Sequence, residues 1–312
     1  MQKTISIVTG WGDGYGAGHV QRMASLCLAL AEVPGIVPVI VSSTRPEFLD
    51  CERKIDFRSA PDPASSLVVR DMRDSTREQM LELKKTAPVL AVDDIGEGRG
   101  LADHVLDLLP NPAVSGENPH HRRDLYLYGC NFMGSLRRLD RERIPKDMDV
   151  LVYSGHLAGG EDEAFFRSII PGEASAVILG GSGRTTLNTQ GDELGRMEYA
   201  ELLARAKVFV SHFGISLYEA RLAGCSVMAL NPSAYHSSLA DMVLGDVVDV
   251  NAGERASLDP AEVRGLCAGL LRDRKTADAR PREMLALAER SLAACRDFVV
   301  ALASGARGKR PS

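Results

Sequence analysis

Residues 10–22 read Gly-Trp-Gly-Asp-Gly-Tyr-Gly-Ala-Gly-His-Val-Gln-Arg, and this stretch decides how the first half of the chain is interpreted. It follows a β-rich run, Thr4–Val8, and precedes Val20–Ala31, where apolar residues recur at helical spacing. A strand, a glycine turn and a helix in this order predict the carboxyl edge of a parallel sheet, where open α/β sheets bind ligands. Glycines there let the backbone approach a ligand, and N–H groups at a helix start attract anions.

Outward from this stretch, short β-rich runs alternate with helical patterns, and the alternation begins again after about residue 145. This predicts an α/β fold of two doubly wound domains, with parallel strands joined by right-handed crossovers. Ser75-Thr76-Arg77-Glu78 resembles a capping box that opens a helix. The expected strands are Thr4–Val8, Val37–Ser42, Leu67–Arg70, Val89–Val92, His104–Leu108, Val150–Tyr153, Ala176–Leu179, Val208–Ser211, Val227–Leu230 and Val247–Val250. The expected helices are Val20–Ala31, Gln79–Lys85, Asp162–Ile170, Glu198–Ala206, Leu217–Ala223, Ser237–Val243, Pro260–Leu271 and Glu283–Leu302.

The length of 312 residues also favours two domains of roughly 150 residues each. We expect the first domain to span 1–145 and the second 149–280, with a closing helix at 281–303 that crosses back toward the first. The charged stretch Asp140–Asp149, which contains Pro145, is the predicted linker.

Composition excludes several classes of partner. The formal net charge is -5 and basic residues are scattered, which argues against nucleic acid as a partner. No run approaches the length of a membrane span, and the N-terminus lacks the basic flank of a signal peptide, so we expect a cytoplasmic protein. The 6 cysteines are widely spaced without a Cys-x-x-Cys pair, which predicts reduced core thiols. The sequence leaves the oligomeric state open.

The glycine stretch does not match the common nucleotide motifs. Gly14, Gly16 and Gly18 alternate, but position 19 is His, so the Gly-x-Gly-x-x-Gly spacing is absent, and there is no Gly-Lys-Ser/Thr P-loop. His19 falls at the start of the predicted helix, where the positive helix end favours a neutral imidazole that is able to accept a proton. The alternative is that His19 only caps the turn.

Gly16, Gly18, His19, Val20 and Arg22 resemble the opening motif of the UDP-sugar hydrolase of pseudaminic acid biosynthesis and of related spore-coat polysaccharide proteins. That family is similar in turn to the transferase that adds N-acetylglucosamine to lipid I, which has the two-domain GT-B fold. Three further stretches carry the likeness: Val89–Asp107, Tyr128–Phe132 with Leu136-Arg137, and Glu198–Ala220.

The resemblance implies a GT-B fold with two Rossmann-like domains facing a central cleft, the first for the acceptor and catalysis and the second for the nucleotide. It implies a small-molecule nucleotide-sugar as ligand, with no cofactor and no metal. His19 would be catalytic, while Gly16, Gly18, Arg22, His156 and His212 would contact sugar or diphosphate. Gly214, Ile215, Ser216, Glu219, Gly181 and Ser182 would bind the nucleotide, with Glu219 accepting hydrogen bonds from ribose. For Glu219 the alternative is a solvated acid on a helix face.

Three functions stay open from the sequence. The first is hydrolysis of a UDP-sugar at the anomeric C–O bond, in surface polysaccharide or nonulosonic acid biosynthesis. The second is glycosyl transfer, although a lipid acceptor is disfavoured because the opening helix has only Arg22 as a basic residue. The third is a non-catalytic nucleotide-sugar-binding protein.

The third reading is kept open by departures from the family pattern, at Ser154–Gly160 and at Tyr235-His236-Ser237. His156 and His212 are too far apart in sequence to indicate a metal site. No counterpart of the family's Asp-Ser-Tyr segment is obvious, and Asp71 or Asp74 is only a loose candidate. Trp11 in the glycine loop suits stacking on a sugar ring or covering the cleft, and the alternative is that it packs against the second domain.

Overall fold

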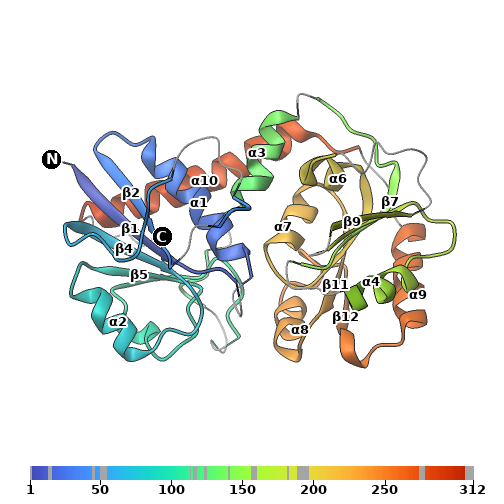
Figure 1. The fold of residues 1–312 in the computed structure, drawn as a ribbon, viewed down its shortest axis with the longest axis horizontal. Helices are drawn as coiled ribbons and strands as arrows, with labels where there is room; N and C mark the ends of the chain where they lie inside the picture. The colour runs from blue at the N-terminus through green and yellow to red at the C-terminus, as the bar shows by residue number, and fades with distance from the viewer. Residues whose placement is uncertain are drawn as a thin grey trace. The chain divides into compact units, whose positions relative to one another are not determined.

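The computed structural model describes residues 2–12, 16–43, 46–49, 55–112, 114, 118–122, 125–139, 141–155, 160–180, 183–187, 197–273 and 278–305. The chain divides into two compact units, one formed by Met1–Gly134 with Ala286–Ser312 and the other by Ser135–Leu285. Each unit is an α/β structure built on its own sheet (Figure 1).

The first unit contains a 6-stranded sheet in the order β3-β2-β1-β4-β5-β6, in which all neighbouring strands are parallel. This is the strand order of a dinucleotide-binding α/β fold, and it reverses direction between β1 and β4. The strands are β1 (Lys3–Thr9), β2 (Ile36–Val41), β3 (Phe57–Arg58), β4 (Ser65–Asp71), β5 (Val89–Val92) and β6 (His104–Leu106). The helices are α1 (Gly18–Ala31), α2 (Arg77–Lys84) and the short η1 (Arg99–Leu101).

Helix α1 packs on the first unit's sheet because its apolar residues fall on one face. Val20, Met23, Cys27 and Leu30 are separated by three or four residues and are all buried. The helix contacts β1 and β2, the two strands that it connects. The strand–glycine turn–helix unit that the opening stretch predicts is therefore confirmed.

The second unit repeats the same strand order, β12-β11-β10-β7-β8-β9. The reversal point here lies between β7 and β10, and β9 pairs with β8 in the antiparallel direction. The strands are β7 (Met148–Tyr153), β8 (Ala176–Gly180), β9 (Gly183–Leu187), β10 (Ala206–Ser211), β11 (Ser226–Asn231) and β12 (Val250–Glu254). The helices are α4 (Gly160–Ser168), α6 (Tyr199–Arg205), α7 (Ile215–Leu222), α8 (Ala234–Asp241), η2 (Arg255–Ser257) and α9 (Pro260–Asp273).

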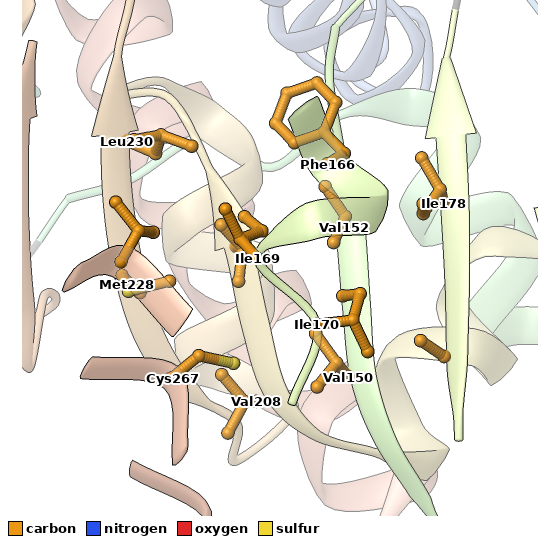
Figure 2. Packing of buried hydrophobic residues seen from close by; sticks show 13 residues of the cluster. Val150, Val152, Phe166, Ile169, Ile170, Ile178, Val208, Met228, Leu230 and Cys267 are labelled. Atoms are coloured by element: carbon orange, nitrogen blue, oxygen red, sulfur yellow. The ribbon is translucent and has the colours of Figure 1, made fainter. Parts of the chain in front are cut away.

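The core on one face of this second sheet follows from the two-residue period of its strands. Alternate residues of each strand point to the same side, where they meet the end of α4 and the helix α9 (Figure 2). The buried cluster consists of Val150, Val152, Phe166, Ile169, Ile170, Ala176, Ile178, Val208, Val210, Met228, Leu230, Val263 and Cys267.

The predicted α/β class with two doubly wound sheets is confirmed, but several element boundaries differ from the predicted ones, and three of the differences have a clear cause. Helix α2 begins one residue after Thr76, whose side chain accepts from the Gln79 N–H while Gln79 bonds back, so the capping box uses Thr76 rather than Ser75. Helix α8 begins earlier than predicted because Ser233 caps it. The last strand begins at Val250 rather than at Val247, because Leu244 and Val248 pair across a tight turn.

The chain passes between the units inside helices rather than through an exposed linker. The unit boundary at Gly134 falls within α3 (Cys130–Arg138), and the return at Leu285 falls within α10 (Pro281–Ala303). The predicted linker 140–149 belongs to the second unit, where Ile144 pairs with Ala279 through two backbone hydrogen bonds of 2.9 Å. The later part of α10 belongs to the first unit, where Ser291 Oγ accepts from the Tyr126 N–H at 2.6 Å.

The described cysteines, Cys27, Cys130, Cys225, Cys267 and Cys295, are all free and buried, as predicted for core thiols. Among the helices that the structure describes, none combines the length and the apolar character that a membrane crossing requires.

Candidate functional site

One candidate site lies in the first unit, where its sheet reverses its strand order. His19 is the second residue of α1, directly after the glycine turn that follows β1. Asp71 is the last residue of β4, the strand on the other side of the reversal point. Residues at this position of an open α/β sheet face the crevice in which ligands bind.

His19 and Asp71 form a dyad. The imidazole Nδ1 of His19 lies 2.8 Å from Oδ1 of Asp71, and the two side chains are 11% and 0% exposed. Burial alone would raise the pKa of Asp71, but its interactions with Arg22 and His19 outweigh burial and lower the pKa to about 2. An ionised carboxylate only accepts hydrogen bonds, so Nδ1 of the neutral imidazole carries the proton and Nε2 is left as the basic atom.

Arg22 lies one turn further along α1 and is buried between two carboxylates. Its guanidinium is 3% exposed, with Nη2 at 2.6 Å from Asp71 Oδ1 and also 2.6 Å from Asp93 Oδ2. Burial opposes the charged form, but Asp71 and Asp93 raise the pKa of Arg22 above its usual value. The expected contact of Arg22 with sugar or diphosphate therefore competes with two ion pairs inside the protein.

The glycine turn is closed by its own backbone. Gly12 and Gly16 exchange N–H···O bonds of 3.3 and 3.1 Å, and Gly16 adopts a left-handed φ of 63° that favours glycine. Gly18 is the first residue of α1. Trp11, just before the turn, packs edge-on against Phe48 with ring centroids 5.3 Å apart.

A separate candidate site lies at the matching reversal point of the second unit's own sheet, between β7 and β10. The turn after β10 is held by side chains from its neighbours. Ser211 Oγ donates to the Tyr153 carbonyl at 2.8 Å, and the Phe213 N–H donates to Asn231 Oδ1 at 2.8 Å. Asn231 is fully buried at the end of β11, so this hydrogen bond anchors the turn to the neighbouring strand.

Helix α7 begins at this turn, with Gly214 as its N-cap and no side chain capping it. The first N–H groups of a helix have no acceptor within the helix, and the helix dipole makes this end attractive to anions. Ile215 and Ser216 occupy the first turn, so their N–H groups are suited to a diphosphate.

Glu219 lies one turn further along α7 and is only 4% exposed. The alternative of a solvated helix-face acid is therefore wrong. Two tyrosines from the same sheet edge, Tyr153 and Tyr199, have ring centroids 5.9 Å apart. Burial, followed by the charge of Glu219, raises the pKa of Tyr153 to about 12 and that of Tyr199 well above 10. A carboxylate among hydroxyl groups is an acceptor site of the kind that ribose hydroxyls would use.

His212 completes this edge as a neutral imidazole. Its Cε1 atom would lie 2.7 Å from a Cβ placed on Gly155, a residue with a left-handed φ of 84°. Burial, with smaller contributions from His236 and Arg255, lowers the pKa of His212 to about 4. The His212 and His236 rings lie with centroids 6.4 Å apart, and His236 Nδ1 is 2.8 Å from Ser233 Oγ.

The depressed pKa of His212 predicts a pH dependence of stability. The unfolded chain binds a proton near pH 6.5 and the folded chain only near pH 4, so stability falls as the pH drops through this window. From pH 7 to pH 5 this contribution lowers the free energy of unfolding by about 2 kcal/mol. We expect the urea-measured difference between wild type and His212→Gln to change by that amount. His120→Gln, at an exposed histidine, is the control, and an equal pH response in both variants would contradict the assignment.

Three predicted site residues, His156, Gly181 and Ser182, lie outside the described residues. The other predicted site residues fall into two groups. At the reversal point of the first unit's sheet lie Gly16, Gly18, His19 and Arg22. At the reversal point of the second unit's sheet lie His212, Gly214, Ile215, Ser216 and Glu219. Over the described part of the chain, no three His, Cys, Asp or Glu side chains are grouped so that they could hold a metal ion.

Sequence reasoning missed Asn231, named Asp93 only within the resembling stretch Val89–Asp107, and held Asp71 only as a loose candidate. The available signal was position, since each follows or ends a β-rich run, as His19 and His212 also do. Their hydrogen-bond partners could not be predicted from the sequence, because 52 positions separate Asp71 from His19 and 18 positions separate Asn231 from Phe213.

Comparisons with known proteins support the fold. No family model matches the chain, and no curated protein matches it. Among solved structures, a glycotransferase of kitacinnamycin aligns with 97% of this chain and 99% of its own, at 13% identity and a TM-score of 0.58. A putative UDP-N-acetylglucosamine 2-epimerase from Listeria monocytogenes covers 100% and 99%, at 11% identity and a TM-score of 0.56. MurG of Acinetobacter baumannii covers 97% and 100%, at 13% identity and a TM-score of 0.55. This chain therefore has the GT-B fold that these enzymes share.

Proposed function

We propose that this protein cleaves the anomeric C–O bond of a nucleotide-sugar and releases a nucleoside diphosphate, with a UDP-sugar as substrate and water as acceptor. The observation that carries the proposal is the His19–Asp71 dyad, with Nδ1 at 2.8 Å from the carboxylate, at the edge where α/β sheets bind ligands. The family resemblance of the opening motif and the GT-B fold both support it.

In this proposal the second unit holds the nucleotide. Ile215 and Ser216 donate backbone N–H groups to the diphosphate at the start of α7, and Gly214 lets it approach. Glu219 accepts hydrogen bonds from the ribose hydroxyls. His212 stays neutral above pH 4, so it donates a hydrogen bond to phosphate without carrying a charge. These donors stabilise the diphosphate as it leaves.

The first unit activates the acceptor. His19 Nε2 takes a proton from water as the water oxygen bonds to the anomeric carbon, and the bond from that carbon to the phosphate oxygen breaks. The electron pair leaves with the diphosphate. Asp71 stabilises the imidazolium that forms, and Gly16 and Gly18 at the glycine turn contact the sugar in this proposal.

Glycosyl transfer is the second candidate, and the same dyad serves it when a hydroxyl of an acceptor molecule replaces water. A glycotransferase and MurG are among the structures with this fold, which favours keeping it. Release of the diphosphate without an added acceptor separates the two, because only hydrolysis proceeds with water alone.

The first test is calorimetric titration of UDP, with GDP and CMP as comparisons. We expect Glu219→Gln to weaken UDP binding about 10- to 100-fold, because hydrogen bonds to a charged group contribute roughly 1.5–3 kcal/mol. Glu201→Gln on helix α6 is the matched control, since Glu201 is a helical acid of the same unit that pairs with Arg141 at 3.9 Å. An assay of UDP release from a panel of UDP-sugars then follows.

Equal UDP affinity in Glu219→Gln and Glu201→Gln would contradict the ribose role of Glu219. Failure of UDP, GDP and CMP to bind the wild-type protein would overturn the nucleotide-sugar proposal itself.

A further inference from the structure

The buried arginine and the carboxylate beyond it are not used by the proposed reaction, yet they touch the dyad. Arg22 follows His19 by three positions on α1, so both side chains lie on one helix face. Arg22 Nε donates to Asp71 Oδ2 and Nη2 donates to Asp71 Oδ1, each at 2.6 Å. Oδ1 is also the atom that faces His19 Nδ1. A two-point guanidinium contact fixes the plane of the carboxylate, and with it the direction in which Oδ1 meets the imidazole.

Asp93 holds the far side of the guanidinium. It follows β5 in a left-handed conformation, φ 50°, that is uncommon for any residue other than glycine. Its Oδ1 accepts from the N–H groups of Leu108 and Leu109 at 2.8 and 2.9 Å, and its Oδ2 lies 2.6 Å from Arg22 Nη2. The carboxylate therefore ties Arg22 to the backbone that follows β6.

We propose that Arg22 and Asp93 form a positioning clamp that orients Asp71 against His19 and thereby holds the imidazole in the tautomer with Nε2 unprotonated. This rests on the proposed function, because it assigns the clamp to the general base of that reaction. The chain of contacts runs from the backbone after β6 through Asp93, Arg22 and Asp71 to His19, with every side chain at most 11% exposed. Arginine suits this place because its planar fork reaches two carboxylates at once, whereas lysine is a point charge.

Other charged groups face the clamp and bear on any pH response. Asp107 after β6 and the Tyr126 hydroxyl contribute to the electrostatics of Asp93 and Arg22 respectively. Burial raises the pKa of Asp93, Arg22 opposes that rise, and Asp71 adds to it. These groups stay unchanged in the variants described next.

A neighbouring pair supplies a matched control. Arg70 and Asp94 are the residues next to Asp71 and Asp93 in the sequence, and they form their own buried pair at 2.9 Å with 4% and 0% exposure. Asp94 accepts from the backbone of Ser75 and Gly96, whereas Asp93 accepts from Leu108 and Leu109. The two adjacent carboxylates thus hold different partners.

The test compares Arg22→Lys with Arg70→Lys and Asp93→Asn with Asp94→Asn. The protein is labelled with ¹⁵N-histidine, and the His19 signals are assigned by their loss in His19→Gln. We expect the wild type and both control variants to show one tautomer, protonated at Nδ1. Arg22→Lys and Asp93→Asn should show mixed tautomers. We also expect kcat for UDP-sugar cleavage to fall about 10- to 100-fold in these two variants with KM little changed, because small displacements of a catalytic group cost rate rather than binding.

The tautomer measurement needs no substrate, so it separates the clamp from the proposed reaction. Mixed tautomers in Arg22→Lys and Asp93→Asn, with a single tautomer in the two control variants, support the clamp even if no UDP-sugar is cleaved. Absence of cleavage would overturn the proposed reaction but not the clamp. A fixed Nδ1 tautomer in these two variants, or the same mixture in the control variants, would overturn the clamp. Urea unfolding of all four identifies any variant that does not fold; for a clamp variant that does not fold, Arg22→Gln or Asp93→Ser replaces it.

Discussion

His19→Gln is expected to lower kcat for UDP-sugar cleavage by a factor of about 10² to 10⁴, the range that a general base contributes. Glutamine has no group that takes a proton at neutral pH, but its amide can still donate to Asp71 and keep that buried carboxylate paired. The measurement is steady-state release of UDP by His19→Gln and by the wild type at several substrate concentrations.

A matched binding experiment shows whether a fall in kcat comes from lost catalysis or from lost substrate binding. Because the residues proposed to bind the nucleotide lie in the other unit, UDP affinity by calorimetry should be the same in His19→Gln and the wild type. Unchanged kcat would remove His19 from the catalytic role and leave it only as the structural partner of Asp71. A wild-type protein that binds UDP-sugars without releasing UDP would favour the non-catalytic binding protein instead.

Asp71→Ala is expected to cost about 3–5 kcal/mol of stability, the largest effect among the substitutions considered. Its carboxylate is 0% exposed and pairs with Arg22, which is 3% exposed, so its removal leaves a guanidinium buried opposite one carboxylate rather than two. Breaking a buried ion pair from one side costs far more than the pair contributes, since the remaining charge keeps its desolvation penalty. The free energy of unfolding from urea titration at pH 7 measures the loss.

Glu82→Ala is the control in the same unit. Glu82 pairs with Lys85 on the surface, where the two side chains are 71% and 72% exposed, and such pairs contribute roughly 0–1 kcal/mol. If Asp71→Ala and Glu82→Ala lowered the free energy of unfolding by similar amounts, the ion pairs at Asp71 would add little to stability. The pKa of about 2 also predicts that the Asp71 contribution persists at pH 5 and is lost only as the pH falls from about 4 toward 2.

Local patterns were sufficient for most of the fold. β1 and α1 each bury a set of apolar side chains whose spacing is visible along a few residues of chain, so period alone identifies them. The two-residue strand β3 and the antiparallel β9 were missed, because strands this short or this polar carry no period of their own. Their existence depends on a neighbouring strand that offers hydrogen bonds.

For the candidate site, too, the sequence predicted some features and not others. Histidines and glycines at strand ends were recognisable from the sequence, because the carboxyl edge of a parallel sheet is implied by each strand followed by a helix. The environment of those residues was not. The two ion pairs that Arg22 makes with Asp71 and Asp93 could not be predicted from the sequence, and neither could the burial of Glu219 beside two tyrosines.

The sequence by itself thus determined the α/β class, the repeat of one sheet pattern in the two halves, and the sheet edges where chemistry gathers. These depend on periodicity and turn residues, which act over neighbours in the chain. Only the tertiary structure decided which carboxylate faces His19, what Arg22 holds and how deeply Glu219 lies. Those answers depend on strand order, and strand order brings β1 beside β4 and β7 beside β10 across stretches of chain in which no local pattern records the partner.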